Sequence, residues 1–342
     1  MNISDLIFNV GVLFIMMIPG VVLRLCKLCP DGFGKGISNL VLYIAQPALI
    51  VHSYLNCDRS FSEIWFNSLV VLILSVLAHV IFALAAIPVF KKAEISKGRM
   101  LKFATVFSNA AFMGMALVQS ILGAEATIYA SIYNITFNLF LWTLGVHFCT
   151  HEQGKDMDGD GDSDLTDAVL SAKHHIKRSG GFVKVLLHPV ILASVIGVAL
   201  FVCGVTVPKM EAAGLGIISD SLLMLKNLVA PLSMVVIGLR LPDVRLTGFF
   251  GDVYMYVFLV LRHLLLPFAV LGVCKLTALM GVEVTSEVLM VTMLLACAPA
   301  ASSATMFAEK YNCDAVYVSR LVVVSTAISI LTMPLVIALS ML

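Results

Sequence analysis

The stretches FATVFSNAAFMGMALVQSILG (103–123) and VTMLLACAPAASSATMFAEKY (291–311) decide the fold of this chain. Both are apolar enough to enter a membrane, yet each has a helix-disfavouring residue near its middle, Asn109 in the first and Pro299 in the second. A helix that breaks at mid-depth leaves backbone groups unpaired where no water is available. Paired interruptions of this kind indicate the binding site of a carrier. The same small residues are also typical of packing seams between intact helices, so both interpretations stay open.

The composition indicates a membrane protein. Hydrophobic residues make up 60% of the 342 residues and charged residues only 13%, whereas soluble domains carry about 25% charged residues. A net charge of +1 gives no basic field for nucleic acid. We therefore expect the lipid bilayer as the surroundings and no nucleic-acid partner.

Ten apolar windows follow one another along the chain, each long enough to cross a bilayer, which takes roughly 20 residues. They lie at 6–23, 36–56, 64–90, 101–121, 124–149, 185–205, 213–239, 249–274, 284–308 and 312–341. The predicted fold is an all-α membrane protein of ten transmembrane helices, with broken, crossing helices 4 and 9. Its predicted parts are a first five-helix repeat (1–149), a cytoplasmic polar loop (150–183) and a second, inverted five-helix repeat (184–342).

Faint self-similarity supports two repeats. IAQPALIV (44–51) lies over LVAPLSMV (228–235) at an offset of 184, and EATIYASI (125–132) lies over DAVYVSRL (314–321) at an offset of 189. Repeats with an odd number of spans insert in opposite orientations. Inverted repeats give a carrier two similar states, each open to one side of the membrane.

The basic residues predict the orientation. Of the 22 Lys and Arg residues, 16 fall in loops 1–2, 3–4, 5–6, 7–8 and 9–10, and only Arg59, Lys209 and Lys275 fall in the loops on the other side. The side rich in Lys and Arg is cytoplasmic by the positive-inside rule. We expect a multi-pass protein of the plasma (cytoplasmic) membrane with both termini outside.

The two breaks predict a site for an anion. Each would start a new half-helix at mid-depth, and a helix N-terminus offers unpaired N–H groups and about half a positive charge. A small carboxylate is the expected substrate. The candidate substrate-binding residues are Ser108, Asn109, Gly114, Pro299, Ala300, Ser302, Ser303, Gln46 and Arg320. Asn109 either contacts the substrate directly or caps the backbone, and Arg320 pairs either with the substrate or with a helix C-terminal carbonyl.

Two histidines are candidates for proton transfer. His79 and His263 lie inside spans at the offset of 184, and a histidine can carry a proton near neutral pH. Hydrogen bonds to a neighbouring helix are the alternative. Because no Asp or Glu lies deep in any span, the coupling ion, proton or sodium, stays open, and so does transport driven by the membrane potential alone. The sequence indicates no cofactor.

The central loop contains a candidate calcium site. DMDGDGDSDLTD (156–167) resembles an EF-hand calcium loop. The candidate calcium ligands are Asp156, Asp158, Asp160, Asp162 and Asp167. Aspartate replaces the usual closing glutamate, and an acidic linker is the alternative.

Several strings resemble the auxin efflux carrier family, also called the AEC or membrane transport protein family. They are FSNAAFMG (107–114), LGAEATIYASIYNITFNLFLWTLGV (122–146), APLSMVVIGLRL (230–241), LRHLLLPF (261–268) and FAEKYNCDAVYVSRLVVVSTAISILTMPL (307–335). The likeness covers essentially the whole chain except 150–183. It is closer to bacterial malate or dicarboxylate permeases than to the plant PIN carriers, which are similar in the same regions.

The resemblance implies a scaffold of spans 1, 2, 6 and 7, often dimeric, and a transport domain of spans 3–5 and 8–10 that moves like an elevator. It implies that Asn109 contacts a substrate carboxylate, as the matching Asn does in the plant carriers. Those carriers have proline at the crossing, where this chain has Ala116 and Ala304. The hinge candidates are therefore Ala116 and Ala304, together with Pro47 and Pro231.

We expect a secondary transporter and not an enzyme, since no H-E-x-x-H or G-x-S-x-G motif lies in a span. The expected assembly is a homodimer through the scaffold helices. A ligand-binding membrane sensor, or a channel of the same fold without coupled transport, is the alternative.

Overall fold

The computed structural model describes residues 3–30, 32–150, 187–243 and 251–340, which fold into helices without any β-strand among them. Seven helical segments in these ranges are long and apolar enough to cross a membrane. They are Phe8–Leu25, Phe33–Leu55, Phe61–Val89, Ala110–Thr150, Gly216–Arg240, Val253–Leu279 and Ala315–Ser340. Two shorter apolar helices are Pro189–Val202 and Ser286–Cys297. The predicted all-helical class is confirmed for the described residues.

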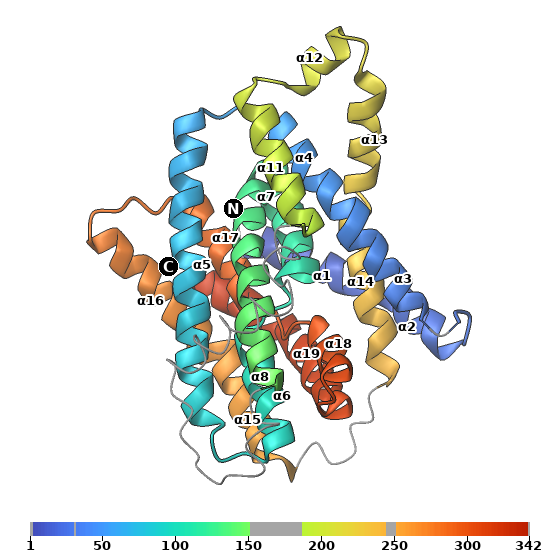
Figure 1. Ribbon diagram of the computed structural model, residues 1–342, viewed down its shortest axis with the longest axis vertical. Coiled ribbons are helices and arrows are strands. Elements are labelled where there is room, and N and C mark those ends of the chain that lie inside the picture. Colours follow the sequence, from blue (N-terminus) through green and yellow to red (C-terminus); the bar gives the residue numbers. More distant parts are fainter. Residues whose placement is uncertain (1–2, 31, 151–186, 244–250, 341–342) are drawn as a thin grey trace.

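The first half of the chain forms the following helices among the described residues. They are α1 (Ile3–Ile15), α2 (Ile18–Leu25), α3 (Phe33–Leu40), α4 (Gln46–Leu55), α5 (Phe61–Val89), α6 (Ile95–Val106), α7 (Met115–Phe140) and α8 (Val146–Thr150). Wider π-helical turns at Val41–Ala45, Ala110–Gly114 and Leu141–Gly145 lead into α4, α7 and α8. In Figure 1, α5 and α7 run side by side along the long axis of the molecule.

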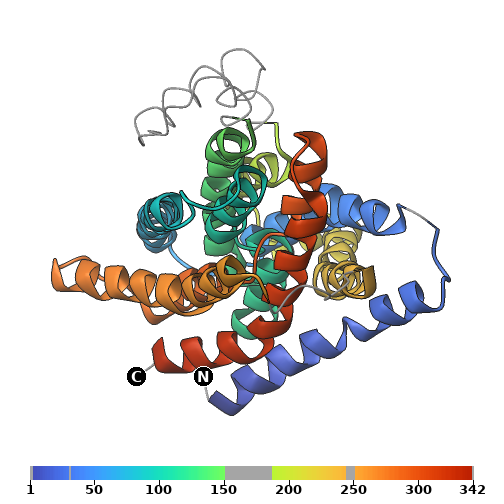
Figure 2. The ribbon, with the colours of Figure 1, turned by 90° about the horizontal axis from the view of Figure 1, so that it is seen from below.

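The second half contributes the other helices of the described ranges. They are α11 (Pro189–Val202), α12 (Val207–Ala212), α13 (Gly216–Lys226), α14 (Val229–Arg240), a 3₁₀ turn (Leu241–Asp243), α15 (Val253–Val260), α16 (Leu266–Leu279), α17 (Ser286–Cys297), α18 (Ser303–Lys310) and α19 (Ala315–Ser340). A π-helical turn, Leu261–Leu265, joins α15 to α16. Figure 2 shows α1 beside α19, so the first and last helices pack together and both termini lie close to each other.

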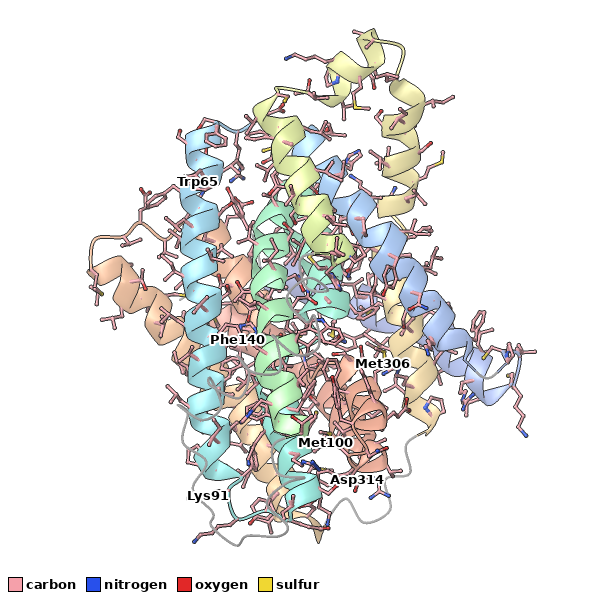
Figure 3. All side chains as sticks on the ribbon, in the orientation of Figure 1. Trp65, Lys91, Met100, Phe140, Met306 and Asp314 are labelled. Atoms are coloured by element: carbon pink, nitrogen blue, oxygen red, sulfur yellow. The ribbon has the colours of Figure 1, made fainter. Side chains whose placement is uncertain are left out.

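The two ends of the molecule carry different loops. In Figure 1, α12 and the start of α5 lie at one end, and the loop between α5 and α6 lies at the other. Lys91 and Asp314 lie at the end opposite Trp65 in Figure 3. The turn after α5 and the residue before α19 thus lie at the same end of the molecule.

Glycine divides the longest segment. Ala110–Thr150 has 41 residues and would be about 60 Å long if straight, twice the roughly 30 Å of a bilayer core. Gly123 has φ 88° and ψ −172°, a conformation that glycine adopts without a steric penalty. The chain turns at this residue, so the segment forms two helical parts.

Helical structure continues through Pro47, and its role as a hinge stays a prediction. The π-helical turn Val41–Ala45 precedes it, and α4 continues through it. A wider turn accommodates the proline ring and the missing N–H, which an ordinary α-helical turn does not. Pro231 lies in the first turn of α14, just after α13 ends at Lys226, where proline costs little.

Candidate functional site: the crossing of two interrupted helices

Two helices end abruptly in the interior. α6 ends at Val106, and Phe107 is extended with φ −96° and ψ 112° before helical structure resumes at Ala110. α17 ends at Cys297, and Ala298 is extended with φ −56° and ψ 145° before α18 begins. Each interruption frees the last carbonyls of one helix and the first N–H groups of the next.

The two interruptions pair with each other. The Asn109 amide donates a hydrogen bond to the Pro299 carbonyl at 2.7 Å, and the Ala301 amide donates to the Phe107 carbonyl at 2.9 Å. Ser108 and Ala300 thereby form an isolated antiparallel bridge. Residues almost 200 positions apart thus satisfy backbone groups that would otherwise be unpaired in an apolar interior.

Ala116 and Ala304 do not mark the interruptions. Ala116 is the second residue of α7 and Ala304 the second residue of α18, and both are helical. The extended backbone lies several residues earlier, at Phe107 and Ala298. Alanine has the highest helix propensity, so it gives no reason for a helix to stop.

Unpaired polar atoms mark the first interruption. The Ser108 hydroxyl and the Asn109 Nδ2 group are buried without a hydrogen-bond partner among the described residues. The Oδ1 atom of Asn109 accepts a hydrogen bond from the Ser302 hydroxyl at 3.4 Å. A buried donor without a partner costs about 1–3 kcal/mol. A ligand oxygen at this position would remove that cost.

Two other predicted residues position the first interruption. The Gln46 side-chain amide, on α4, donates a hydrogen bond to the Ala111 carbonyl. A Cβ atom on Gly114 would lie 2.5 Å from Cδ2 of Leu295. Gly114 therefore allows the start of α7 to approach α17 closely, which is a packing role.

The second interruption has more partners. Nη1 of Arg240 donates to the Ser302 carbonyl at 2.6 Å, and the Ala300 amide donates to the Ser325 hydroxyl at 2.9 Å. Nε2 of His263 lies 2.9 Å from that hydroxyl, and its Nδ1 lies 3.1 Å from the Thr332 hydroxyl. A neutral imidazole with its proton on Nδ1 satisfies every group in this chain.

His79 has different surroundings. Its Nδ1 lies 2.7 Å from the Ser75 carbonyl, and its ring stacks on Phe140 with 5.1 Å between ring centres. Tyr133 and Phe137 pack at 5.5 and 6.1 Å. The side chain is 1% exposed. His79 is thus held in an aromatic cage on α5 and α7, and His263 in a chain of hydroxyl groups.

Arg262, a basic residue, also lies at the crossing. The guanidinium of Arg262, in the turn between α15 and α16, donates to the Thr105 carbonyl at 3.1 Å and to the Ala296 and Ala298 carbonyls at 3.1 and 2.6 Å. The residue is fully buried. Arg262 is not among the site residues predicted from the sequence. A charge in an apolar run is the signal that could have found it.

A cavity of about 690 Å³ lies next to the crossing. Phe112, Ser302 and Ser303 from the two interrupted segments contribute to its lining. Met306 of α18, which also lines it, lies on the side facing α14 in Figure 3. The predicted residues Ser108, Asn109, Pro299 and Ala300 are not among the lining residues, and Asn109 is connected to the cavity through Ser302.

The cavity is basic. Its lining includes four basic side chains, Arg24, Lys35, Arg240 and Arg320, and one acidic side chain, Glu309. Nε of Arg320 is buried without a hydrogen-bond partner among the described residues. An anion is therefore the ligand that this cavity attracts most strongly.

An ionic network lies at the other end of the molecule. Arg59 pairs with Glu287 of α17, with Glu125 of α7 at 2.9 Å and with Glu63 of α5 at 3.4 Å. Burial lowers the pKa of Arg59, but the hydrogen bond and charge of Glu287 raise it by more. The pKa of Arg59 lies above its usual value, so the residue stays charged.

The described ranges contain no group of three or more His, Cys, Asp or Glu side chains that could hold a metal ion. The calcium candidates Asp156, Asp158, Asp160, Asp162 and Asp167 lie outside the described residues.

Comparison with known proteins assigns the chain to a family. A family model described as membrane transport protein matches residues 6–337. No curated protein matches the sequence. The match covers both interruptions, the cavity and nearly all of the apolar segments. The chain therefore belongs to the membrane transport protein family, the auxin efflux carrier family, and is a multi-pass membrane protein of a transporter family.

Proposed function

We propose that this protein is a secondary transporter that moves a small organic anion, a carboxylate, across the cytoplasmic membrane. One observation carries the proposal: a basic cavity adjoins two interrupted helices whose Asn109 and Ser108 side chains have unpaired polar atoms. Half-helix N-termini attract negative charge. A carboxylate is an acceptor for these N–H donors and a counter-charge for Arg320.

Ten spans in two inverted halves are the arrangement we propose for the membrane. The turn at Gly123 divides Ala110–Thr150 into two spans. The pairs α6 with the start of α7, and α17 with α18, would each form one interrupted span, and α11 would be the sixth span. His79 and His263 occupy matching places on α5 and in the turn before α16, which supports the repeat.

We propose an elevator movement, with α5–α8 and α15–α19 carrying the crossing along a scaffold of α1–α4 and α11–α14. The scaffold would be the surface of a homodimer. Close contact between α2 and α14 supports a rigid scaffold, since a Cβ atom on Gly20 would lie 2.2 Å from the Val235 carbonyl. The cavity would face the cytoplasm, because Lys35 and Arg24 lie in or beside a loop on the side rich in Lys and Arg.

Uptake into proteoliposomes tests the proposal. Purified protein is screened by thermal shift against mono- and dicarboxylates, and radiolabelled forms of those that stabilise it are then tested for uptake. We expect saturable uptake that protein-free vesicles lack. Stabilisation without uptake would favour the sensor, uptake that never saturates would favour the channel, and no response to any carboxylate would contradict an anion site.

A further inference from the structure

Arg262 lies where two helices end. Its guanidinium contacts the last carbonyls of α6 and α17: Thr105 at 3.1 Å, Ala296 at 3.1 Å and Ala298 at 2.6 Å. Helix C-termini carry about half a negative charge each. Arg262 thus connects the negative ends of both interrupted helices, whereas their successors present N-terminal ends to the cavity region.

No carboxylate balances this charge. Within the described residues, Arg262 forms no ion pair with Asp or Glu, and the sequence has no acidic residue deep in a span. The ring of Phe82 lies 5.1 Å from its Cζ atom, a distance at which an aromatic face stabilises a cation. The carbonyl groups and this ring are the partners that make a fully buried cation tolerable.

Carbonyls at the C-terminal ends of broken membrane helices are the groups that coordinate Na⁺ in sodium-coupled carriers. We infer that Arg262 is a built-in cation at the crossing that takes the place of a coupling Na⁺, so that substrate movement requires no sodium. The part of the inference that concerns sodium-independent transport rests on the proposed function. The cation site itself can be tested without any substrate.

Thermal stability in different salts provides that test. Wild-type protein and an Arg262→Ala variant are compared in NaCl and in choline chloride at about 0.15 M. We expect wild type to be equally stable in both salts. Arg262→Ala frees the three carbonyls and opens space, so we expect NaCl to raise its Tm above that in choline chloride by about 3 °C or more.

Two matched variants separate charge from structure. Arg262→Lys keeps a cation at the carbonyls, so it should show no sodium-specific stabilisation. Lys275→Gln removes a positive charge from an exposed position on α16 and should behave as wild type. These comparisons exclude a general salt effect and remain informative if Arg262→Ala is much less stable than wild type.

Uptake in proteoliposomes provides the second readout, with the carboxylate that gives the largest signal in the screen. We expect equal wild-type rates in sodium and choline media, and at least a tenfold loss for Arg262→Ala in choline that sodium partly restores. Sodium-specific stabilisation or sodium-dependent uptake of wild type would overturn the inference. It would also fail if Arg262→Ala showed no sodium-specific stabilisation. Absence of all uptake would instead contradict the proposed function.

Discussion

The two helix interruptions have the same general construction but very different support. Two side chains hold the second interruption, because Arg240 donates a hydrogen bond to the Ser302 carbonyl and the Ser325 hydroxyl accepts one from the Ala300 amide. At the first, the Ser108 hydroxyl and Asn109 Nδ2 have no partner among the described residues. A buried polar group without a partner calls for an explanation, and a ligand that is absent from the structure is one such explanation. We propose that the first interruption supplies ligand donors, which connect to the cavity through Ser302, and that the second interruption supplies the frame.

The largest effect is expected at Asn109. Asn109→Asp places a negative charge beside a bound carboxylate, and we expect apparent affinity to fall about 100-fold, equivalent to about 3 kcal/mol. Asn109→Ala removes only a donor and should cost about tenfold. The KM of carboxylate uptake measures both. Asn138→Ala is the control, because Asn138 is a buried asparagine of α7 whose Nδ2 already binds the Asn134 carbonyl. Equal effects of the Asn109 and Asn138 variants on KM would remove the distinction between the two interruptions.

At the second interruption, removal of a supporting side chain should lower the stability of the protein. Ser325→Ala leaves the Ala300 amide and Nε2 of His263 without their partner, and we expect a loss of about 2 kcal/mol in the free energy of unfolding. Thermal unfolding measures the loss. Ser329→Ala is the control, since the Ser329 hydroxyl binds only the Thr326 carbonyl of its own helix. A large rise in KM with unchanged stability would show that Ser325 acts on the ligand.

Contact between the two interrupted segments gives a smaller effect. Gly114→Ala brings a methyl group against Leu295, and overpacking of this kind costs about 1–3 kcal/mol. Leu295→Ala removes Cδ2 of Leu295, the atom that the new methyl group would clash with. The Gly114→Ala/Leu295→Ala double variant should therefore be more stable than the sum of the two single losses predicts. If the stability losses of the two single variants simply added in the double variant, the methyl group at position 114 and Leu295 would not be in steric conflict.

The smallest effect is expected far from the crossing. Arg59→Gln removes the pairs with Glu125 and Glu287, and partly exposed pairs of this kind contribute about 1 kcal/mol or less. The loss should shrink at high salt, because salt screens such charges. Lys97→Gln, which breaks the exposed pair with Glu94, should change thermal stability by less. If Arg59→Gln lowered thermal stability more than Ser325→Ala does, the ion pair of Arg59 with Glu287 at the start of α17 would stabilise this helix more than the contacts at its end.

Much of the overall class could be predicted from the sequence. The low charge and the apolar windows led to a membrane protein, and the strings around FSNAAFMG (107–114) led to the family that the comparison shows. The apolar window 213–239 matches the segment Gly216–Arg240 closely. Seven segments meet the criteria for a membrane span in the described ranges, and the count of ten stays a prediction.

The detailed site could not be predicted because backbone contacts leave little trace in a sequence. Thr105 and Ala298 contribute carbonyl groups to Arg262, and any residue type has a carbonyl. Ala116 and Ala304 were chosen by analogy with prolines, whereas the extended residues are Phe107 and Ala298. Substrate contacts, dimerisation and proton transfer through His79 or His263 stay predictions.

The reciprocal backbone bonds between the two interruptions have a mechanical consequence. Breaking both backbone hydrogen bonds, from the Asn109 amide to Pro299 and from the Ala301 amide to Phe107, would leave four buried peptide groups without partners, at a cost of several kcal/mol each. Any change between a state open to one side of the membrane and a state open to the other must therefore keep both hydrogen bonds. In the elevator movement that we propose, the two interruptions would therefore move together as one unit.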